Sequence, residues 1–156
     1  MGKGSLPFSV GLAFKLISNF ESKGCWDRLF ATGKAVRNLG PNLELVYSSL
    51  KPVWPTSARD FCAVSRARLK KDGSIWLGIV SASPQLEVPH VAGRTRGNLI
   101  FGGWILEPGD DDGTCKATYI VLVDPNGSIP KAIVNKVSWG LGFNCGSSLP
   151  AQQLLI

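Results

Sequence analysis

The sequence predicts an α+β fold in which a curved antiparallel sheet is preceded and followed by a helix. Apolar residues recur at helical spacing near the N-terminus, whereas the middle of the chain alternates apolar and polar residues with the period of two that marks strands. Glycine, proline, aspartate and asparagine separate these strands at intervals short enough for hairpins. This order of elements favours a sheet that curls round a helix and forms a one-sided cup.

The leading helix is expected over residues 9–21. Gly24 follows the helical pattern and is expected to end the helix, because glycine is common just past a helix C-terminus. The apolar residues that recur there at the spacing of one helical face are Val10, Phe14 and Ile17.

Six strands are expected to follow, separated by turns. The Asp72-Gly73 turn is a strong hairpin signal, and a Gly40-Pro41-Asn42 turn joins the first two strands. The short connections make consecutive strands antiparallel neighbours. The expected strands are residues 33–39, 43–50, 59–70, 75–83, 98–106 and 115–123.

A second helix is expected after the last strand. Pro130 stands where the first turn of a helix tolerates proline, and apolar residues continue the helical pattern to Val137. The pattern is lost after about two turns. Residues 138–156 are rich in glycine and are expected to form an irregular tail.

The strand at residues 59–70 has one face made of small side chains. By alternation, that face holds Phe61, Ala63, Ser65 and Ala67. An ordinary packed core face is one interpretation of it. We favour the other, the wall of a cavity, because side chains this small leave room for another molecule. The residues of the other strands that alternation assigns to the same cavity are Val46, Ser48, Leu50 and Tyr119.

The loop before this strand holds Trp54 between two prolines. Proline fixes its own φ and makes its neighbour extended, so the loop from Pro52 to Pro55 is stiff and cannot be helical. An exposed tryptophan in such a loop would be a rigid amphipathic wedge suited to a membrane interface. A tryptophan packed in the core is the alternative.

The chain carries 17 basic and 11 acidic residues, a formal net charge of +6. This balance suits an anionic membrane surface or a nucleic acid. The longest basic run is the pair Lys70-Lys71, so we expect a solvated basic surface and no nucleic-acid partner. The four cysteines are widely spaced and there is one histidine, which argues against a metal site and gives no reason to expect a cofactor.

The most apolar segment near the N-terminus, residues 6–20, is too short to span a bilayer and contains Lys15. It also lacks a credible cleavage site for a signal peptide. We therefore expect a cytoplasmic protein that associates with membranes only peripherally.

Four blocks of the sequence together resemble a START (StAR-related lipid-transfer) domain, and most closely its ceramide-transfer branch. The first is Trp26-Asp27, and the second is KPVWPTSARDF, which begins at Lys51 and has Tyr47 upstream. The third runs over residues 73–84, and the fourth is TCKATYIVLVDPNGSIPKAIVNKV at residues 114–137. The resemblance covers about residues 14–137.

The resemblance implies a helix-grip fold, a curved antiparallel sheet with a C-terminal helix over the mouth of its cavity. It implies binding of one lipid, transfer of that lipid between membranes, and no enzymatic activity. Compared with a full START domain, the leading helix, the first strands and part of the closing helix are missing. We therefore expect residues 1–156 to form a single incomplete domain, truncated at both ends.

The resemblance also suggests roles for individual residues. Asp27 stands where the ceramide-transfer branch has the acidic residue that binds the amide and hydroxyl groups of the ligand, and Ser48 stands where that branch has an amide side chain. Trp54 matches a loop tryptophan that enters membranes. The cholesterol branch has an arginine at the position of Ser65, so its signature is absent. The lipid class stays open between sphingolipid, phospholipid and sterol.

Two alternatives belong to other functional classes. A truncated START-derived chain could lack transfer activity of its own and act through interaction with other proteins, or not act at all. A small enzyme with a related cavity could use His90, the single histidine, as a general base. No Ser/His/acid set is evident, so no catalytic residue is expected.

Overall fold

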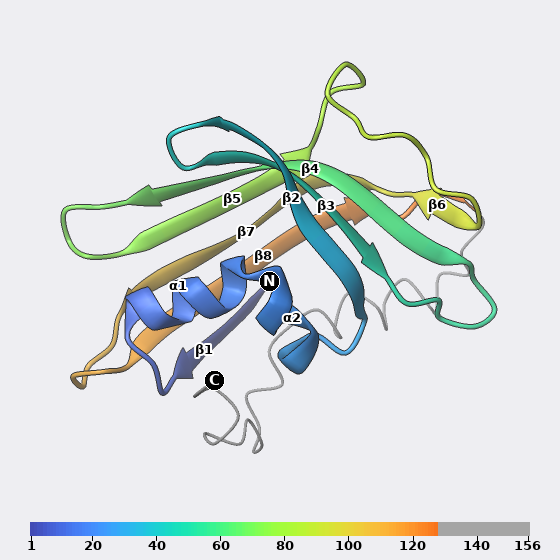
Figure 1. Ribbon diagram of the computed structural model, residues 1–156. Coiled ribbons are helices and arrows are strands. Elements are labelled where there is room, and N and C mark those ends of the chain that lie inside the picture. The colour runs from blue at the N-terminus through green and yellow to red at the C-terminus, as the bar shows by residue number, and fades with distance from the viewer. Residues whose placement is uncertain (128–156) are drawn as a thin grey trace.

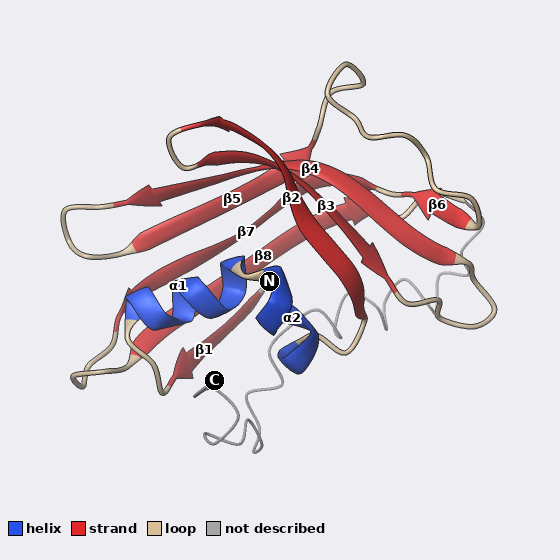
Figure 2. Ribbon diagram, viewed as in Figure 1, coloured by secondary structure: helices blue, strands red, loops and turns tan. Residues whose placement is uncertain are grey.

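The computed structural model describes residues 1–127 and confirms the α+β class. One eight-stranded sheet curls strongly, and two short helices lie on its concave side (Figures 1 and 2). Along the sheet the strand order is β1-β8-β7-β5-β4-β3-β2, with β6 beside β4. The elements are β1 (Gly2–Leu6), α1 (Val10–Ser18), α2 (Phe20–Trp26), β2 (Phe30–Gly40), β3 (Leu43–Leu50), β4 (Ala58–Leu69), β5 (Ile75–Ser81), β6 (Arg94–Arg96), β7 (Asn98–Pro108) and β8 (Cys115–Asp124).

The single helix expected over residues 9–21 is in fact two helices that meet at Asn19. The backbone N–H of Asn19 donates to the Lys15 carbonyl and closes α1, while its side chain accepts from the Glu21 N–H and opens α2. One asparagine thus satisfies orphan backbone groups at both helix ends. The expectation that Gly24 ends the helix is wrong, because Gly24 lies inside α2.

The hairpins predicted from the turns are present. β2 pairs with β3, β4 with β5 and β7 with β8, all antiparallel. Two strands were not predicted. β1 pairs with β8, placing Gly2 opposite Tyr119, and β6 runs parallel to β4, placing Arg94 opposite Ala58. Both are short and lack apolar alternation, so the sequence pattern carries no signal for them.

The main core lies between α1 and the concave face of the sheet. Trp104 is central to it, with its ring centroid 4.4 Å from that of Tyr119 and 6.5 Å from that of Trp26. The buried members of this cluster are Leu6, Ala13, Ile17, Leu77, Trp104, Leu106, Cys115 and Ala117. A smaller cluster around Leu45 and Cys62 contains Ala82 and packs against Leu86 and Val88 of the following loop.

No helix within residues 1–127 is long and apolar enough to cross a membrane. The helix expected from Pro130 and the irregular tail expected over residues 138–156 lie outside the described residues.

Candidate functional site

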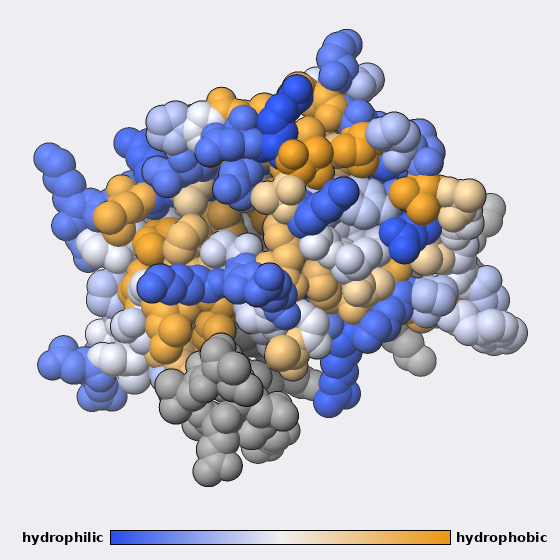
Figure 3. All heavy atoms as spheres, viewed as in Figure 1, coloured by the Kyte–Doolittle hydropathy of each residue, from blue (hydrophilic) through white to orange (hydrophobic). Residues whose placement is uncertain are grey.

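A largely apolar pocket opens on the concave side of the sheet, next to the helical core. Its volume is about 230 Å³. In Figure 3, apolar side chains gather around a recess between α1 and the strands above it. The sheet contributes residues of β3, β4, β5, β7 and β8, and the helices contribute Ile17, Ser18, Phe20 and Lys23. The curl of the sheet and the short helices therefore enclose a space that side chains do not fill.

Eight of the nine side chains that the sequence suggested for a cavity line this pocket. They are Asp27, Val46, Ser48, Leu50, Phe61, Ala63, Ser65 and Tyr119. The binding of a lipid by these side chains stays a prediction.

Ala67 differs from the expectation, because it is not among the residues that line the pocket. It lies opposite Leu77 on β5 and packs against the core cluster that includes Ala13 and Ile17. β4 extends past the end of the pocket, so Ala67 meets the core instead of open space.

Gly97 leaves room for the ring of Phe61, the largest side chain on the small-residue face. A Cβ at Gly97 would lie 2.4 Å from the ring of Phe61. Only a residue without a side chain lets the ring lie there. The sequence pattern gave no indication of this contact, because Gly97 lies between β6 and β7.

Other lining residues could have been identified from the sequence and were not. Val121 and Val123 follow Tyr119 at the spacing of one strand face and also line the pocket. Ile79 and Leu99 line it from β5 and β7. Of the helical lining residues, Ile17 belongs to the apolar face predicted for the helix, whereas Ser18 and Lys23 had no such signal.

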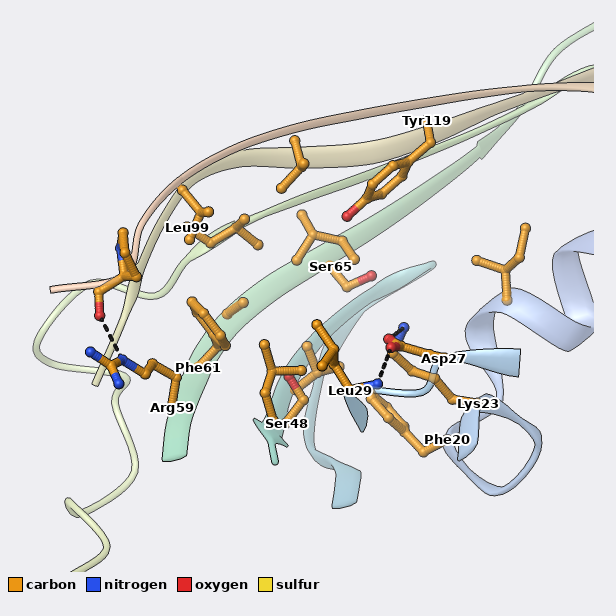
Figure 4. A pocket seen from close by; sticks show the side chains of 18 of the residues that line it. Phe20, Lys23, Asp27, Leu29, Ser48, Arg59, Phe61, Ser65, Leu99 and Tyr119 are labelled. Carbon is orange, nitrogen blue, oxygen red and sulfur yellow. Dashed lines mark hydrogen bonds and ion pairs between the residues drawn. The ribbon is translucent and has the colours of Figure 1, made fainter. Parts of the chain in front are cut away.

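At one end of the pocket, Asp27 is held in place by α2 and the turn that follows. Its side chain lies 3.0 Å from the ammonium of Lys23, one helical turn earlier, and accepts from the Leu29 N–H at 3.1 Å. Asp27 is 5% exposed, and Lys23 also lies 4.2 Å from the ring centroid of Trp26. The buried carboxylate is therefore compensated by a charge and a hydrogen bond, as buried charges require. Figure 4 shows this pair facing the pocket.

Six hydroxyl-bearing residues of the described chain line the pocket, and those of the sheet interior are Ser48, Ser65 and Tyr119. Burial, and then the charge of Asp27, raise the pKa of Tyr119 to about 12, so the phenol stays protonated at neutral pH. Figure 4 shows the hydroxyls of Tyr119 and Ser65 directed into the same space. Within residues 1–127, the side-chain hydroxyls of Tyr119, Ser65 and Ser48 form no hydrogen bond to another protein group. These hydroxyls are thus available to a bound molecule.

The opposite end of the pocket is closed by Arg59. Its guanidinium donates to the carbonyls of Ser57, Pro125 and Asn126, which ties β4 to the end of β8. Asp60 does not pair with it, because alternation along β4 directs that carboxylate to the other face of the sheet. Arg59 and Asp60 therefore make separate contacts on opposite faces of the sheet and do not form an ion pair with each other.

The loop that carries Trp54 borders the pocket. Trp54 is 90% exposed, so the alternative of a tryptophan packed in the core is wrong. Val53 and Thr56 line the pocket, and Thr56 donates from its backbone and its hydroxyl to the Val53 carbonyl. One turn therefore directs the tryptophan outward and its neighbours inward.

His90 is exposed. No cluster of three or more His, Cys, Asp or Glu side chains that could hold a metal ion occurs within the part of the chain that the structure describes.

The sequence is similar to a known protein family and to individual proteins. The START domain family model matches residues 10–141. The uncharacterized protein PA1579 of Pseudomonas aeruginosa is 30% identical over 110 residues, which are 70% of this chain and 52% of that protein. Ceramide transfer protein of Mus musculus is 26% identical over 135 residues, covering 77% of this chain and 22% of that protein. The chain therefore spans about half or less of these curated relatives.

Among solved structures, human StAR-related lipid transfer protein 5 superimposes with a TM-score of 0.79 at 17% sequence identity. The match covers 89% of this chain and 67% of that one. Human STARD10 gives a TM-score of 0.77 at 22% identity, over 87% of this chain and 55% of that one. At these identities the likeness concerns the fold, and it confirms the helix-grip sheet expected from the sequence.

Proposed function

This chain belongs to the START domain family, and from that membership we propose that it binds a single lipid in the pocket and transfers it between membranes. The observation that carries the proposal is the apolar recess on the concave face, which contains hydroxyl groups that have no partner among the described residues. Small-molecule sites commonly combine an apolar lining with a few polar groups that orient the ligand. The relatives named for lipid or ceramide transfer support the same reading.

The lipid's apolar part would lie against the small-residue face of β4. Ala63 and Ser65 leave the space there, and Ile17 and Phe20 cover it from the helices. The polar part would reach the end of the pocket where Asp27 and the hydroxyl of Tyr119 lie. Binding and release of the lipid need no chemical step, so the proposed role is not enzymatic.

Entry and exit would take place at the loop that carries Trp54. Because Val53 and Thr56 line the pocket while Trp54 faces solvent, insertion of that tryptophan into a bilayer brings the pocket close to the lipid surface. This role fits a cytoplasmic protein that meets membranes peripherally, with the net charge of +6 favouring anionic surfaces.

The proposal is tested by measuring transfer of a fluorescent lipid from donor to acceptor vesicles. We expect the transfer rate to rise in proportion to protein concentration. If the chain unfolds cooperatively and neither extracts nor transfers lipid, the alternative role in interaction with other proteins gains support instead.

Trp54→Ala tests the membrane contact. Loss of one interfacial tryptophan should weaken vesicle binding and slow transfer about tenfold, since burying a large apolar side chain contributes about 1.5–3 kcal/mol. Trp76→Ala is the matched control, because Trp76 is 46% exposed and belongs to β5 away from the loop. Equal effects of the two substitutions would argue against a specific role for Trp54.

A further inference from the structure

The charges around the pocket bear on which lipid headgroups it can hold. Burying a phosphate is costly unless a cation compensates it, whereas burying a hydroxyl requires only a hydrogen bond. An interior cation that is free to meet a phosphate would therefore favour phospholipids. The charged residues that line the pocket are Lys23, Asp27, Glu44, Lys51 and Arg59.

Arg59 is occupied by the protein itself. Its Nε lies 3.4 Å from the Pro125 carbonyl oxygen and its Nη2 lies 3.2 Å from that of Asn126, while Nη1 donates to Ser57. The side chain is 8% exposed. A headgroup that recruited this guanidinium would have to compete with these three carbonyls and would break hydrogen bonds that tie β4 to the end of β8.

Lys23 is occupied as well. Its ammonium lies 3.0 Å from Asp27 and 4.2 Å from the ring centroid of Trp26. The carboxylate cancels the charge that a phosphate would need. A phosphate that approached Lys23 would also meet the negative charge of Asp27.

The remaining charged side chains lie at the exposed margin. Lys51 and Glu44 are both exposed, one cation and one anion. Water screens an exposed charge, so the attraction of Lys51 for a buried anion is much weaker than that of a buried cation. Glu44, at the other end of β3, carries a negative charge and gives a phosphate no compensation.

Three polar groups in the interior of the pocket are neutral hydroxyls. The hydroxyls of Ser48, Ser65 and Tyr119 have no protein partner within residues 1–127. Because the pKa of Tyr119 is raised to about 12, its phenol acts as a neutral donor. Each of these hydroxyls can both donate and accept, which suits hydroxyl and carbonyl groups of a ligand.

We propose that the pocket selects lipids with an uncharged, hydroxyl-bearing headgroup and discriminates against lipids that carry a phosphate. The inference rests on the proposed function, because it concerns the ligand of the same pocket. It narrows the open choice between sphingolipid, phospholipid and sterol to sphingolipids without a phosphate and sterols, because every phospholipid carries that group.

The test compares a fluorescent diacylglycerol with the phosphatidic acid that has the same acyl chains, each presented in phosphatidylcholine vesicles. The two probes differ only in the phosphate. After removal of the vesicles, we expect the protein to hold at least about ten times more diacylglycerol than phosphatidic acid. Equal capture, or a preference for phosphatidic acid, would overturn the inference and leave the proposed lipid binding intact. Capture of neither probe by a folded protein would contradict the proposed function as well.

The substitution Asp27→Asn tests whether the Lys23–Asp27 ion pair causes the preference for diacylglycerol over phosphatidic acid. The amide keeps the shape and the acceptor for Leu29 but frees the Lys23 ammonium. We expect the capture of phosphatidic acid relative to diacylglycerol to rise about tenfold. The matched control is Asp110→Asn, which removes an acid paired with Lys116 at the surface, outside the pocket.

An unchanged ratio in folded Asp27→Asn would contradict the role of the pair, and a rise in Asp110→Asn would show that overall charge and not the pocket sets the ratio. If Asp27→Asn does not fold, the wild-type ratio decides the inference alone.

Discussion

At the scale of single residues, Asp60 is a carboxylate that is only 1% exposed and therefore needs partners to compensate its charge. Arg96 donates to both of its oxygens, at 2.8 and 3.2 Å, and the Tyr47 hydroxyl donates at 3.1 Å. Burial alone would raise the pKa of Asp60, but the hydrogen bonds and charge of Arg96, with Tyr47, outweigh it and hold the pKa below its ordinary value. This network joins β3, β4 and β6 on the face of the sheet opposite the pocket.

The lowered pKa predicts a dependence of stability on pH. A group whose pKa is lower in the folded state adds stability that is present above its unfolded pKa, ordinarily 3.8, and lost as pH falls through the folded value. Asp60→Asn should therefore lower the free energy of unfolding by about 3 kcal/mol at pH 7, because Arg96 loses its buried partner. The deficit should shrink below pH 3.8, since acid protonates Asp60 in the wild type. Denaturant unfolding at a series of pH values measures it, and a deficit constant with pH would contradict the account.

Side-chain direction could be predicted from the sequence where it depends only on alternation along a strand. Val46, Ser48 and Ser65 could be assigned to the pocket in that way, since strand residues two apart share a face. The ion pair of Asp27 with Lys23 could not be predicted, because that required knowing that residues 20–26 form a separate helix. The contact of Phe61 with Gly97 could not be predicted either, because it depends on long-range packing.

At the scale of elements, β5 and β7 pair at two opposed glycines. Gly78 and Gly103 face each other across the two strands. A Cβ at Gly103 would lie 2.3 Å from the Leu77 carbonyl oxygen, whereas a Cβ at Gly78 would have no atom within 4 Å. Only one of the two glycines is therefore required by the backbone.

Gly103→Ala should destabilise the protein by about 1–3 kcal/mol, because the new methyl group overlaps a backbone oxygen that cannot turn away. Gly78→Ala is the matched control and should be neutral or slightly stabilising, since it restricts the unfolded chain without a clash. Thermal unfolding of both variants checks the pair. A larger loss for Gly78→Ala would contradict the described pairing of β5 and β7.

Elements were predictable where strong local signals existed. The Asp72-Gly73 turn identified its hairpin, and four further strands were placed from alternation and glycine or proline punctuation. The break between α1 and α2 escaped because Asn19 is compatible with a helical pattern and becomes a cap only when both helices pack on the sheet. β1 and β6 escaped because their pairing partners lie far away in the sequence.

At the scale of the whole molecule, the curled sheet leaves a recess because α1 fills only part of its concave side. The core cluster around Trp104 supports one end, and the Arg59 clamp closes the other. Between them the small side chains of β4 leave about 230 Å³ unfilled. An unfilled apolar space of this kind costs stability unless a ligand occupies it, and this makes lipid binding the central claim.

Native mass spectrometry of the folded chain, after incubation with vesicles of phosphatidylcholine and diacylglycerol and removal of the vesicles, tests that claim most directly. We expect a species heavier than the protein by the mass of one diacylglycerol molecule. A folded chain detected only at its lipid-free mass, across a range of vesicle concentrations, would contradict it.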